Sequence, residues 1–192
     1  MVNEEMREIP PMEEADEKGK STVAGLYEWI GAAIFSLAFV VLVFTFLFRI
    51  VGVVGNSMNP TLSWGDRLII TRLGYTPQQG DIVIVNRYTE EPLVKRVVAV
   101  GGQTLRIDDE TGTVYVNGKA LDEPYIQGHT YSLGFGAEEQ TVPEGCVFVM
   151  GDNREHSKDS RYMDEVGFVS ESDVIGKAVF RFLPLNKAKS LY

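Results

Sequence analysis

Residues 81–100 read DIVIVNRYTEEPLVKRVVAV and contain two runs rich in β-branched residues, 81–85 and 93–100, with a polar segment between them. Short runs of Val and Ile bounded by Asn, Asp, Gly or Pro are typical of β-strands. We therefore expect two neighbouring strands here. The charged residues Lys95 and Arg96 lie inside the second run.

The same pattern continues on both sides of this stretch. Further runs of β-branched and aromatic residues cover 67–70, 146–150 and 178–182, and a hairpin is predicted from 104–107 to 113–118. No long amphipathic helix is predicted in this part of the chain. The patterns indicate a mainly β domain over 51–192, barrel-like or coiled, with a small inserted β subdomain or flap at about 103–143.

An unbroken apolar run, 29–48, precedes the β pattern. Its length matches the roughly 20 residues that a helix needs to cross a bilayer. The run is longer than the apolar core of a cleaved signal peptide and starts farther from the N-terminus. We therefore predict a single transmembrane helix over 27–50, with Tyr27 and Trp29 at one interface and Arg49 at the other. A buried core helix is the alternative.

Residues 1–26 are predicted to form an acidic, disordered tail, because they contain few large apolar residues. The net charge of −9 gives no indication of a nucleic-acid partner, so none is expected. Lys18 and Lys20 before the anchor, against Arg49 and Arg67 after it, slightly favour a cytoplasmic N-terminus.

Ser57 lies nine residues beyond the apolar run, in the segment 55–60, GNSMNP. A serine among Gly, Asn and Pro is by default a turn residue. Nine extended residues reach roughly 30 Å, so Ser57 stays close to the membrane surface. To act as a nucleophile, its hydroxyl needs a base within hydrogen-bonding distance.

Lys95 is the best candidate for that base. Strand alternation places it on one face with Leu93 and Val97, where desolvation lowers the pKa of an amine. A neutral amine can act as a general base, whereas the guanidinium of Arg96 stays charged. The alternative for Lys95 is a surface position or an ion pair with a carboxylate.

Other nucleophiles and bases have weaker support. His156 with Asp152 or Asp159 would complete a Ser-His-Asp triad, but its charged neighbours favour a solvated loop. His129 lies in a polar loop without other catalytic residue types. Cys146 is the only cysteine, so no intrachain disulfide can form, and the apolar residues after it favour a small buried side chain over a thiol nucleophile.

Residues 151–161 read GDNREHSKDSR and follow an apolar run. Such a density of short polar and charged side chains is typical of a solvated loop. It also suits a supporting layer around a site, in which a hydroxyl orients the lysine amine and an Asp–Arg pair fixes the loop. The sequence is compatible with both interpretations.

Four segments in this order, behind an apolar anchor, resemble the bacterial type I signal peptidases (leader peptidases) of the Gram-positive kind. They are 55–68 around Ser57, 80–85, 95–102 beginning with Lys95, and 151–161. The resemblance covers most of residues 30–185. It implies a serine endopeptidase with a Ser-Lys dyad, in a β domain behind a membrane anchor.

The resemblance also implies roles for single residues. Ser57 would be the nucleophile, its N–H one oxyanion donor, and Lys95 the general base. Four supporting residues are implied: Ser157, which would orient the lysine amine, the pair Asp159 and Arg161, and Asp152, which would help to hold the loop. The partners would be secreted preproteins, cut after small residues at positions −1 and −3, and the lipid bilayer, without metal or cofactor.

An extended substrate would add to a strand edge. We expect such edges near 53–54 and along 81–85. The substrate-binding residues expected there are Val53, Val54, Asp81, Ile82, Val83 and Ile84. This activity requires the β domain on the outer side of the membrane and the N-terminus in the cytoplasm.

Three features differ from the family's usual pattern. Gly55 stands where some members have a serine whose hydroxyl is the second oxyanion donor, so that donor is not identified. Residues 100–103, VGGQ, replace a Leu-Pro-Gly-Asp turn. The loop Met163 to Val166 is longer than is usual in the family.

Two alternatives remain at the level of the sequence. A self-cleaving Ser-Lys protein of the SOS-repressor kind has a related fold, but it would carry a DNA-binding segment and lack an anchor. A membrane-tethered β domain without catalysis would bind a partner, and the substitutions Ser57→Ala and Lys95→Met would leave its function intact.

Overall fold

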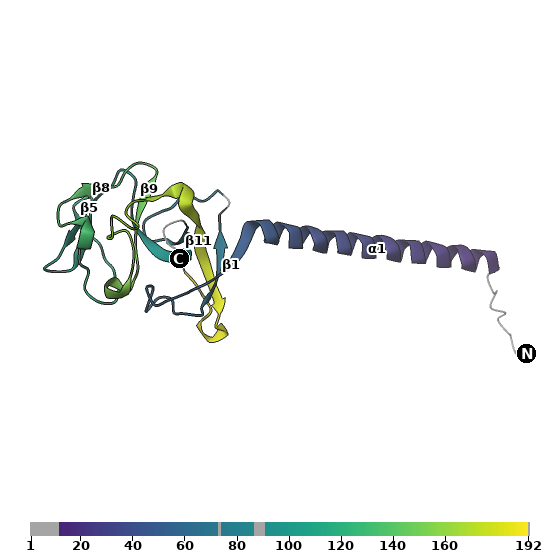
Figure 1. Cartoon of the computed structure of the whole chain (residues 1–192). Coiled ribbons are helices and arrows are strands. Elements are labelled where there is room, and N and C mark those ends of the chain that lie inside the picture. Colours follow the sequence, from purple (N-terminus) through teal and green to yellow (C-terminus); the bar gives the residue numbers. More distant parts are fainter. Residues whose placement is uncertain (1–11, 73, 87–90, 192) are drawn as a thin grey trace, which may run out of the picture. The chain divides into compact units, whose positions relative to one another are not determined.

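A computed structural model describes residues 12–72, 74–86 and 91–191 of the chain. It divides into two compact units, one that ends at Phe46 and one that spans Leu47–Tyr192. The first unit is helical and the second is mainly β (Figure 1). The mainly β fold class predicted from the alternating and β-branched runs is confirmed.

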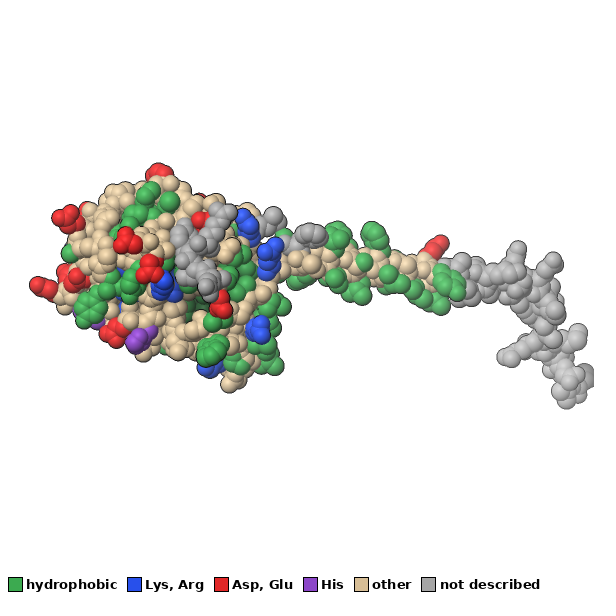
Figure 2. All heavy atoms as spheres, in the orientation of Figure 1, with side chains coloured by type: hydrophobic (Ala, Val, Ile, Leu, Met, Phe, Trp, Pro, Cys, Tyr) green, Lys and Arg blue, Asp and Glu red, His purple; other side chains and the backbone are tan. Residues whose placement is uncertain are grey.

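The helical unit contains α1, Met12–Leu47. Within it, the 21 residues Gly25–Thr45 are long and apolar enough to cross a membrane, and among the described residues this is the one such helix. Its large side chains are exposed, Trp29 to 80% and Phe35 to 76%. Apolar side chains accordingly lie along the visible face of α1 (Figure 2).

The tail predicted for residues 1–26 differs from the structure over 12–26, because α1 begins at Met12. This segment is rich in Glu, Ala and Lys, which have high helix propensity, and it continues directly into the apolar helix. The prediction for residues 1–11 lies outside the described residues.

The β unit is built on one eight-stranded antiparallel sheet with the order β1-β2-β11-β3-β4-β9-β10, in which β12 also pairs with β11. Its strands are β1 Phe48–Gly52, β2 Arg67–Thr71, β3 Ile82–Val85, β4 Leu93–Val100, β9 Cys146–Met150, β10 Val169–Ser170, β11 Val174–Leu183 and β12 Lys189–Ser190. The anchor predicted over 27–50 thus ends earlier, at Leu47, because the last apolar residues of the run enter β1.

A second sheet lies inside the stretch predicted as an insertion, with the order β7-β6-β5-β8. Its strands are β5 Thr104–Asp108, β6 Thr113–Val116, β7 Lys119–Ala120 and β8 Gln140–Thr141. In the view of Figure 1, β5 and β8 lie at one end of the β unit, β1 and β11 at the other, and β9 between them. Four short 3-10 helices complete the unit: η1 Leu133–Phe135, η2 Arg154–His156, η3 Glu171–Asp173 and η4 Leu185–Lys187.

The strands at the centre of the large sheet are covered on both faces. Ile82 and Ile84 of β3 belong to one core cluster with Leu68 of β2, whereas Val83 and Val85 belong to another with side chains of β9. A third cluster joins the small sheet to β9, with Leu105 of β5 and Phe148 of β9 among its members. Phe135 of η1 belongs to the same cluster, and its ring centroid lies 4.8 Å from that of Phe148. Burial on both faces explains why β3 shows a continuous apolar run and no alternation with polar residues.

Candidate active site

Ser57 lies in the loop between β1 and β2, and this loop is fixed at both ends. Val53 N–H donates to Asp66 O at 2.8 Å, and Gly65 N–H donates to Val53 O at 3.0 Å. Met58 and Leu62 bury their side chains in the core cluster below. Ser57 is therefore held at the rim of the core, partly exposed.

A buried ion pair holds the same loop from β11. Arg181 Nη1 donates to Asp66 Oδ2 at 2.8 Å and to Thr61 O at 3.0 Å. Asp66 Oδ2 also accepts from Ser63 N–H at 3.0 Å. The loop that carries Ser57 is thus attached to the middle of the large sheet, which restricts its movement.

Lys95 reaches Ser57 from β4. Its side chain is only 2% exposed, and its Nζ donates to Ser57 Oγ at 2.7 Å. The structure thus brings together the two residues that we predicted as nucleophile and base, although 38 positions separate them in the chain. The alternative surface position for Lys95 is excluded by its burial.

Burial lowers the pKa of Lys95 from its ordinary value of 10.5 to about 8. The Asp159 carboxylate opposes this shift, while the positive charge of Arg161 adds to it. A substantial fraction of the amine is therefore neutral slightly above neutral pH. A neutral amine next to a serine hydroxyl can accept its proton, and this arrangement can support nucleophilic acyl transfer.

Asp159 and Arg161 form the predicted pair after β9, and both are almost fully buried. Arg161 Nε donates to Asp159 Oδ1 at 2.8 Å and its Nη2 to Asp159 Oδ2 at 2.9 Å. Asp159 Oδ2 also accepts from Gly151 N–H at 3.0 Å. The bidentate pair fixes the loop after β9 to its own start.

Asp152 pairs with Arg96, which sequence reasoning did not include in the site. Arg96 Nε donates to Asp152 Oδ1 at 2.9 Å and its Nη2 to Oδ2 at 2.7 Å. The guanidinium also lies 3.9 Å from the ring centroid of Tyr125. The position of Arg96 inside an apolar strand did indicate a partner, because a buried charged residue is almost always paired. The sequence does not show which carboxylate that partner is.

A second missed pair joins the insertion to the same loop. Arg154 Nη2 donates to Glu123 Oε1 at 2.6 Å, and Nη1 donates to Thr130 Oγ1 at 2.7 Å. The backbones meet as well, since Gln127 N–H donates to Asp152 O and Arg154 N–H to Gln127 O. Glu123 lies within the loop-rich insertion and has no sequence signal that distinguishes it from a surface residue.

Ser157 does not form the predicted hydrogen bond to the lysine amine. Its Oγ is buried and has no hydrogen-bond partner among the described residues. It lies against Gly151, where a Cβ would overlap both Ser157 and the carbonyl oxygen of Ser57. Ser157 therefore lies near the nucleophile loop, and its hydroxyl makes no hydrogen bond to a described residue.

Neither histidine is built into this arrangement. His156 is exposed on η2, and the two carboxylates proposed for a triad, Asp152 and Asp159, are each engaged by an arginine. His129 is half-buried and its Nε2 contacts Asp109 O at 2.8 Å. Within the part of the chain that the structure describes, no group of three or more His, Cys, Asp or Glu side chains is arranged to hold a metal ion.

The expected substrate edge along 81–85 is wrong. β3 pairs with β11 on one side and with β4 on the other, and Ile82, Val83 and Ile84 are buried within the sheet. The long apolar run reflects this central position, and no edge strand is required to explain it. Val53 is also buried, whereas Val54 is 62% exposed next to the nucleophile loop.

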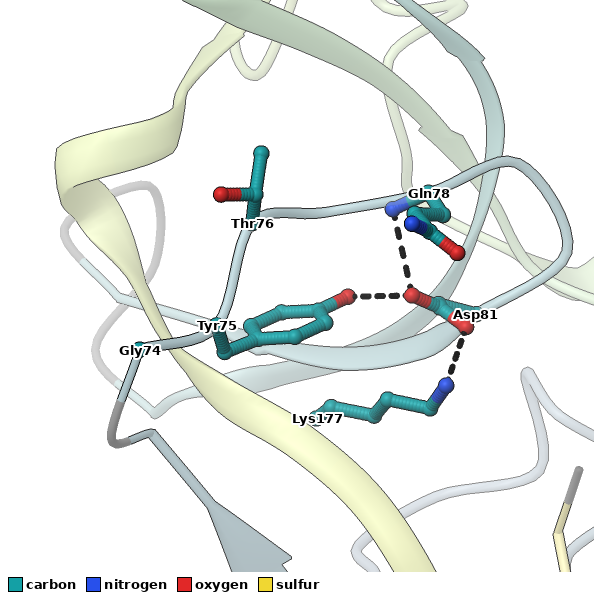
Figure 3. Close-up of a pocket in the computed structure, with 6 residues that line it drawn as sticks. All are labelled: Gly74, Tyr75, Thr76, Gln78, Asp81 and Lys177. Atoms are coloured by element: carbon teal, nitrogen blue, oxygen red, sulfur yellow. Dashed lines mark hydrogen bonds and ion pairs between the residues drawn. The ribbon is translucent and has the colours of Figure 1, made fainter.

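Asp81 lines an open polar pocket of about 340 Å³ with Tyr75, Gln78 and Lys177 (Figure 3). Its Oδ2 accepts from Tyr75 Oη at 2.7 Å and from Gln78 N–H at 3.1 Å, and its Oδ1 pairs with Lys177 at 2.6 Å. Burial raises the pKa of Tyr75, so its hydroxyl stays protonated. Asp81 thus links the approach to β3 with β11, and its carboxylate is already engaged on both oxygens.

The buried Lys95 beside Ser57, on a coiled β sheet, is an arrangement of the kind that serine hydrolases use. The chain matches the family described as signal peptidase, peptidase S26, over residues 26–183. It is 35% identical over 187 residues to a signal peptidase I of Bacillus licheniformis, which covers 91% of this chain and 97% of that protein. The protein therefore belongs to the S26 signal peptidase family, and it is a hydrolase of signal peptides.

Two further relatives are similar over much of their length. Signal peptidase IB of Staphylococcus aureus strain Mu50 is 32% identical over 182 residues, covering 85% of this chain and 93% of that protein. A crystal structure of a signal peptidase I from Enterococcus faecalis V583 covers 54% of this chain and 97% of that chain, with 31% identity and a TM-score of 0.44. The Bacillus and Staphylococcus relatives come from Gram-positive bacteria, the kind that the sequence resembles.

Proposed function

We propose that the protein removes signal peptides with a Ser-Lys dyad, in which Ser57 is the nucleophile and Lys95 the general base. The observation that carries this proposal is the 2.7 Å contact between Lys95 Nζ and Ser57 Oγ, with the lysine buried. Desolvation supplies the neutral amine that the reaction needs, since it lowers the pKa of Lys95 to about 8. Ser57 N–H supplies one oxyanion donor.

The dyad serves both halves of the reaction. Ser57 Oγ attacks the scissile carbonyl while Lys95 Nζ takes its proton, and a tetrahedral oxyanion forms. Lys95 then returns this proton to the leaving amine, which departs as the new N-terminus of the mature protein. Water attacks the acyl-enzyme as Lys95 takes its proton, and the same proton passes back to Ser57 Oγ when the signal peptide leaves.

The charged pairs behind the dyad hold it in place. Asp159 with Arg161 fixes the start of the loop after β9, and Asp152 with Arg96 fixes this loop to β4, the strand that carries Lys95. Ser157 Oγ, which is buried without a partner, is the group available to bond the lysine amine when a substrate closes the site. These residues act on the reaction through the positions of Ser57 and Lys95.

The substrate is an extended segment with small residues at −1 and −3. Backbone for pairing is found beside the dyad on β4, because its pairing with β9 begins only at Arg96 and β9 does not pair with Leu93–Lys95. Exposed Val54 lies on the other chain segment next to Ser57 and offers an apolar contact. The substrate backbone pairs there as an added strand.

The enzyme acts at the membrane, with α1 as a single-pass anchor, the N-terminus in the cytoplasm and the β unit outside. Support comes from the 21-residue apolar segment of α1 and from the chemistry of its substrates, whose signal peptides are themselves apolar membrane segments. Since β1 starts directly after α1, the dyad is close in sequence to the bilayer surface.

Cleavage of a preprotein by the purified protein in detergent tests the dyad. We expect Ser57→Ala and Lys95→Met each to lower kcat at least about 1,000-fold, because residues that act as a unit lose most of the catalysis together. The matched controls are Ser172→Ala and Lys119→Met, which make the same changes at residues outside the site. Processing by Lys95→Met at a rate close to that of the unchanged protein would exclude the lysine base.

A further inference from the structure

Asn153, in the loop after β9, holds both peptide units on either side of Ser57 Cα. Its backbone N–H donates to Ser57 O at 3.0 Å, and its side-chain Nδ2 donates to Asn56 O at 3.2 Å. Asn153 is 5% exposed. Its position is fixed by a β-bridge to Gln127, which hydrogen-bonds through its backbone to Asp152 and Arg154 on either side. No other described residue contacts both of these carbonyls through hydrogen bonds.

The bond to Asn56 O determines where the Ser57 N–H points. Asn56 C=O and Ser57 N–H belong to one trans peptide, which is planar, so the two groups point in opposite directions. Fixing the carbonyl towards Asn153 therefore directs the N–H away from it. A carbonyl that accepts a hydrogen bond also polarises the N–H of its own peptide and strengthens it as a donor.

The Ser57 N–H has no competing acceptor among the described residues, so it can donate to a substrate oxyanion. It donates no hydrogen bond to any described residue, whereas Asn56 O accepts from Asn59 N–H at 3.1 Å as well as from Asn153. With Gly55 in the chain, no hydroxyl two residues before the nucleophile can serve as a second donor. Without that second donor, stabilisation of the oxyanion depends strongly on the direction of the Ser57 N–H, the one donor identified.

We infer that Asn153 is the positioning residue for the oxyanion donor of Ser57, acting through the Asn56–Ser57 peptide. The inference rests on the proposed dyad and adds to it a residue that touches neither Lys95 Nζ nor Ser57 Oγ. The Asn153 side chain directs the N–H that stabilises the transition state, while the backbone N–H of Asn153 keeps the Ser57 carbonyl in place in any variant at this position.

Two substitutions separate hydrogen bonding from side-chain size. Asn153→Ala removes the donor. Asn153→Asp keeps the shape of the side chain but places a carboxylate oxygen against Asn56 O. Both oxygens can only accept a hydrogen bond, so the bond is lost. The matched control is Gln79→Ala, since Gln79 Nε2 makes the same kind of bond to a backbone carbonyl, Val98 O at 2.8 Å, without touching the Ser57 loop.

The full chain in detergent is assayed with a peptide that spans a signal cleavage site, and kcat is normalised to the folded fraction from the melting amplitude. We expect Asn153→Ala to lower kcat about 10- to 100-fold, within the range for a misdirected oxyanion donor, with KM nearly unchanged. Asn153→Asp loses at least as much, and Gln79→Ala retains wild-type kcat. The acid limb of the pH profile stays in place, because Lys95 is untouched.

A peptide aldehyde gives an independent readout. It adds to Ser57 Oγ as a hemiacetal whose oxygen occupies the place of the oxyanion, so its affinity should fall by about the same factor as kcat. The inference would be overturned if Asn153→Ala kept the wild-type kcat or Asn153→Asp kept the wild-type activity. A change confined to KM, or a shift of the acid limb of the pH profile, would overturn it as well. Failure of the dyad itself is distinguishable, because Ser57→Ala would then still cleave.

Discussion

In the proposed dyad Lys95 is the general base, and its burial sets the pH at which its amine is neutral. Desolvation disfavours the ammonium form and lowers the pKa to about 8, so protonation below this pH removes the base. The β unit also fixes the amine beside Ser57 Oγ, so its contribution requires no movement before the reaction.

We therefore expect kcat/KM to rise about tenfold per pH unit on the acid side and to level off above about pH 8. Since kcat/KM reports the free enzyme, the midpoint should match the pKa of Lys95. The profile is measured with a peptide substrate in detergent, with melting curves at each pH to confirm that the protein stays folded. A constant kcat/KM from about pH 6 to 9 would contradict the assignment of Lys95 as base.

The elements around the site are joined by buried charges that link distant parts of the chain. Arg96 on β4 and Asp152 after β9 form a bidentate pair across 56 positions, and Asp152 is fully buried. A pair of this kind contributes little relative to an apolar pair, but removing one partner leaves an uncompensated charge in the interior.

Asp152→Asn should therefore lower the free energy of unfolding by about 3 kcal/mol or more, because Arg96 stays charged and loses its carboxylate. The matched control is Glu165→Gln, which removes the carboxylate of an exposed pair with Lys158. We expect that control to change stability little. The free energy of unfolding is measured with denaturant in detergent. An equal decrease in the two variants would show that the buried pair contributes no more to stability than an exposed one.

The elements also show what the sequence could predict. The apolar runs 93–100 and 146–150 match β4 and β9, since composition alone distinguishes buried strands. The start of β1 was assigned to the predicted anchor, because the composition does not change where the apolar helix ends and the apolar strand begins. The substrate edge on β3 was wrong for a similar reason: pairing partners are long-range, and the 81–85 run does not reveal them.

In the candidate site, single residues were more predictable than their partners. Ser57, Lys95 and the pair Asp159 and Arg161 could be named because the four ordered segments that contain them resemble a known family. Each residue alone has an ordinary structural explanation. Glu123, which pairs with Arg154 from within the insertion, could not be found, because only the fold brings it there.

At the scale of the molecule, the proposed function assigns membrane attachment to the helical unit and the chemistry to the β unit. All three core clusters are formed by residues of the β unit alone, so Leu47–Tyr192 contains the burial needed to fold. Ten residues separate Leu47 from Ser57, and even fully extended they span only about 35 Å. An anchored β unit thus keeps its dyad near the membrane in which signal peptides reside.

Removing residues 1–46 should consequently separate two activities. Cleavage of a peptide in solution should stay within about threefold, whereas cleavage of a preprotein held in vesicles should fall about 10- to 100-fold, because the tether no longer supplies a high effective concentration. Both rates are measured at the same enzyme concentration. An equal loss on both substrates would mean that α1 supports the site itself, and an equal retention would mean that the anchor contributes nothing to substrate encounter.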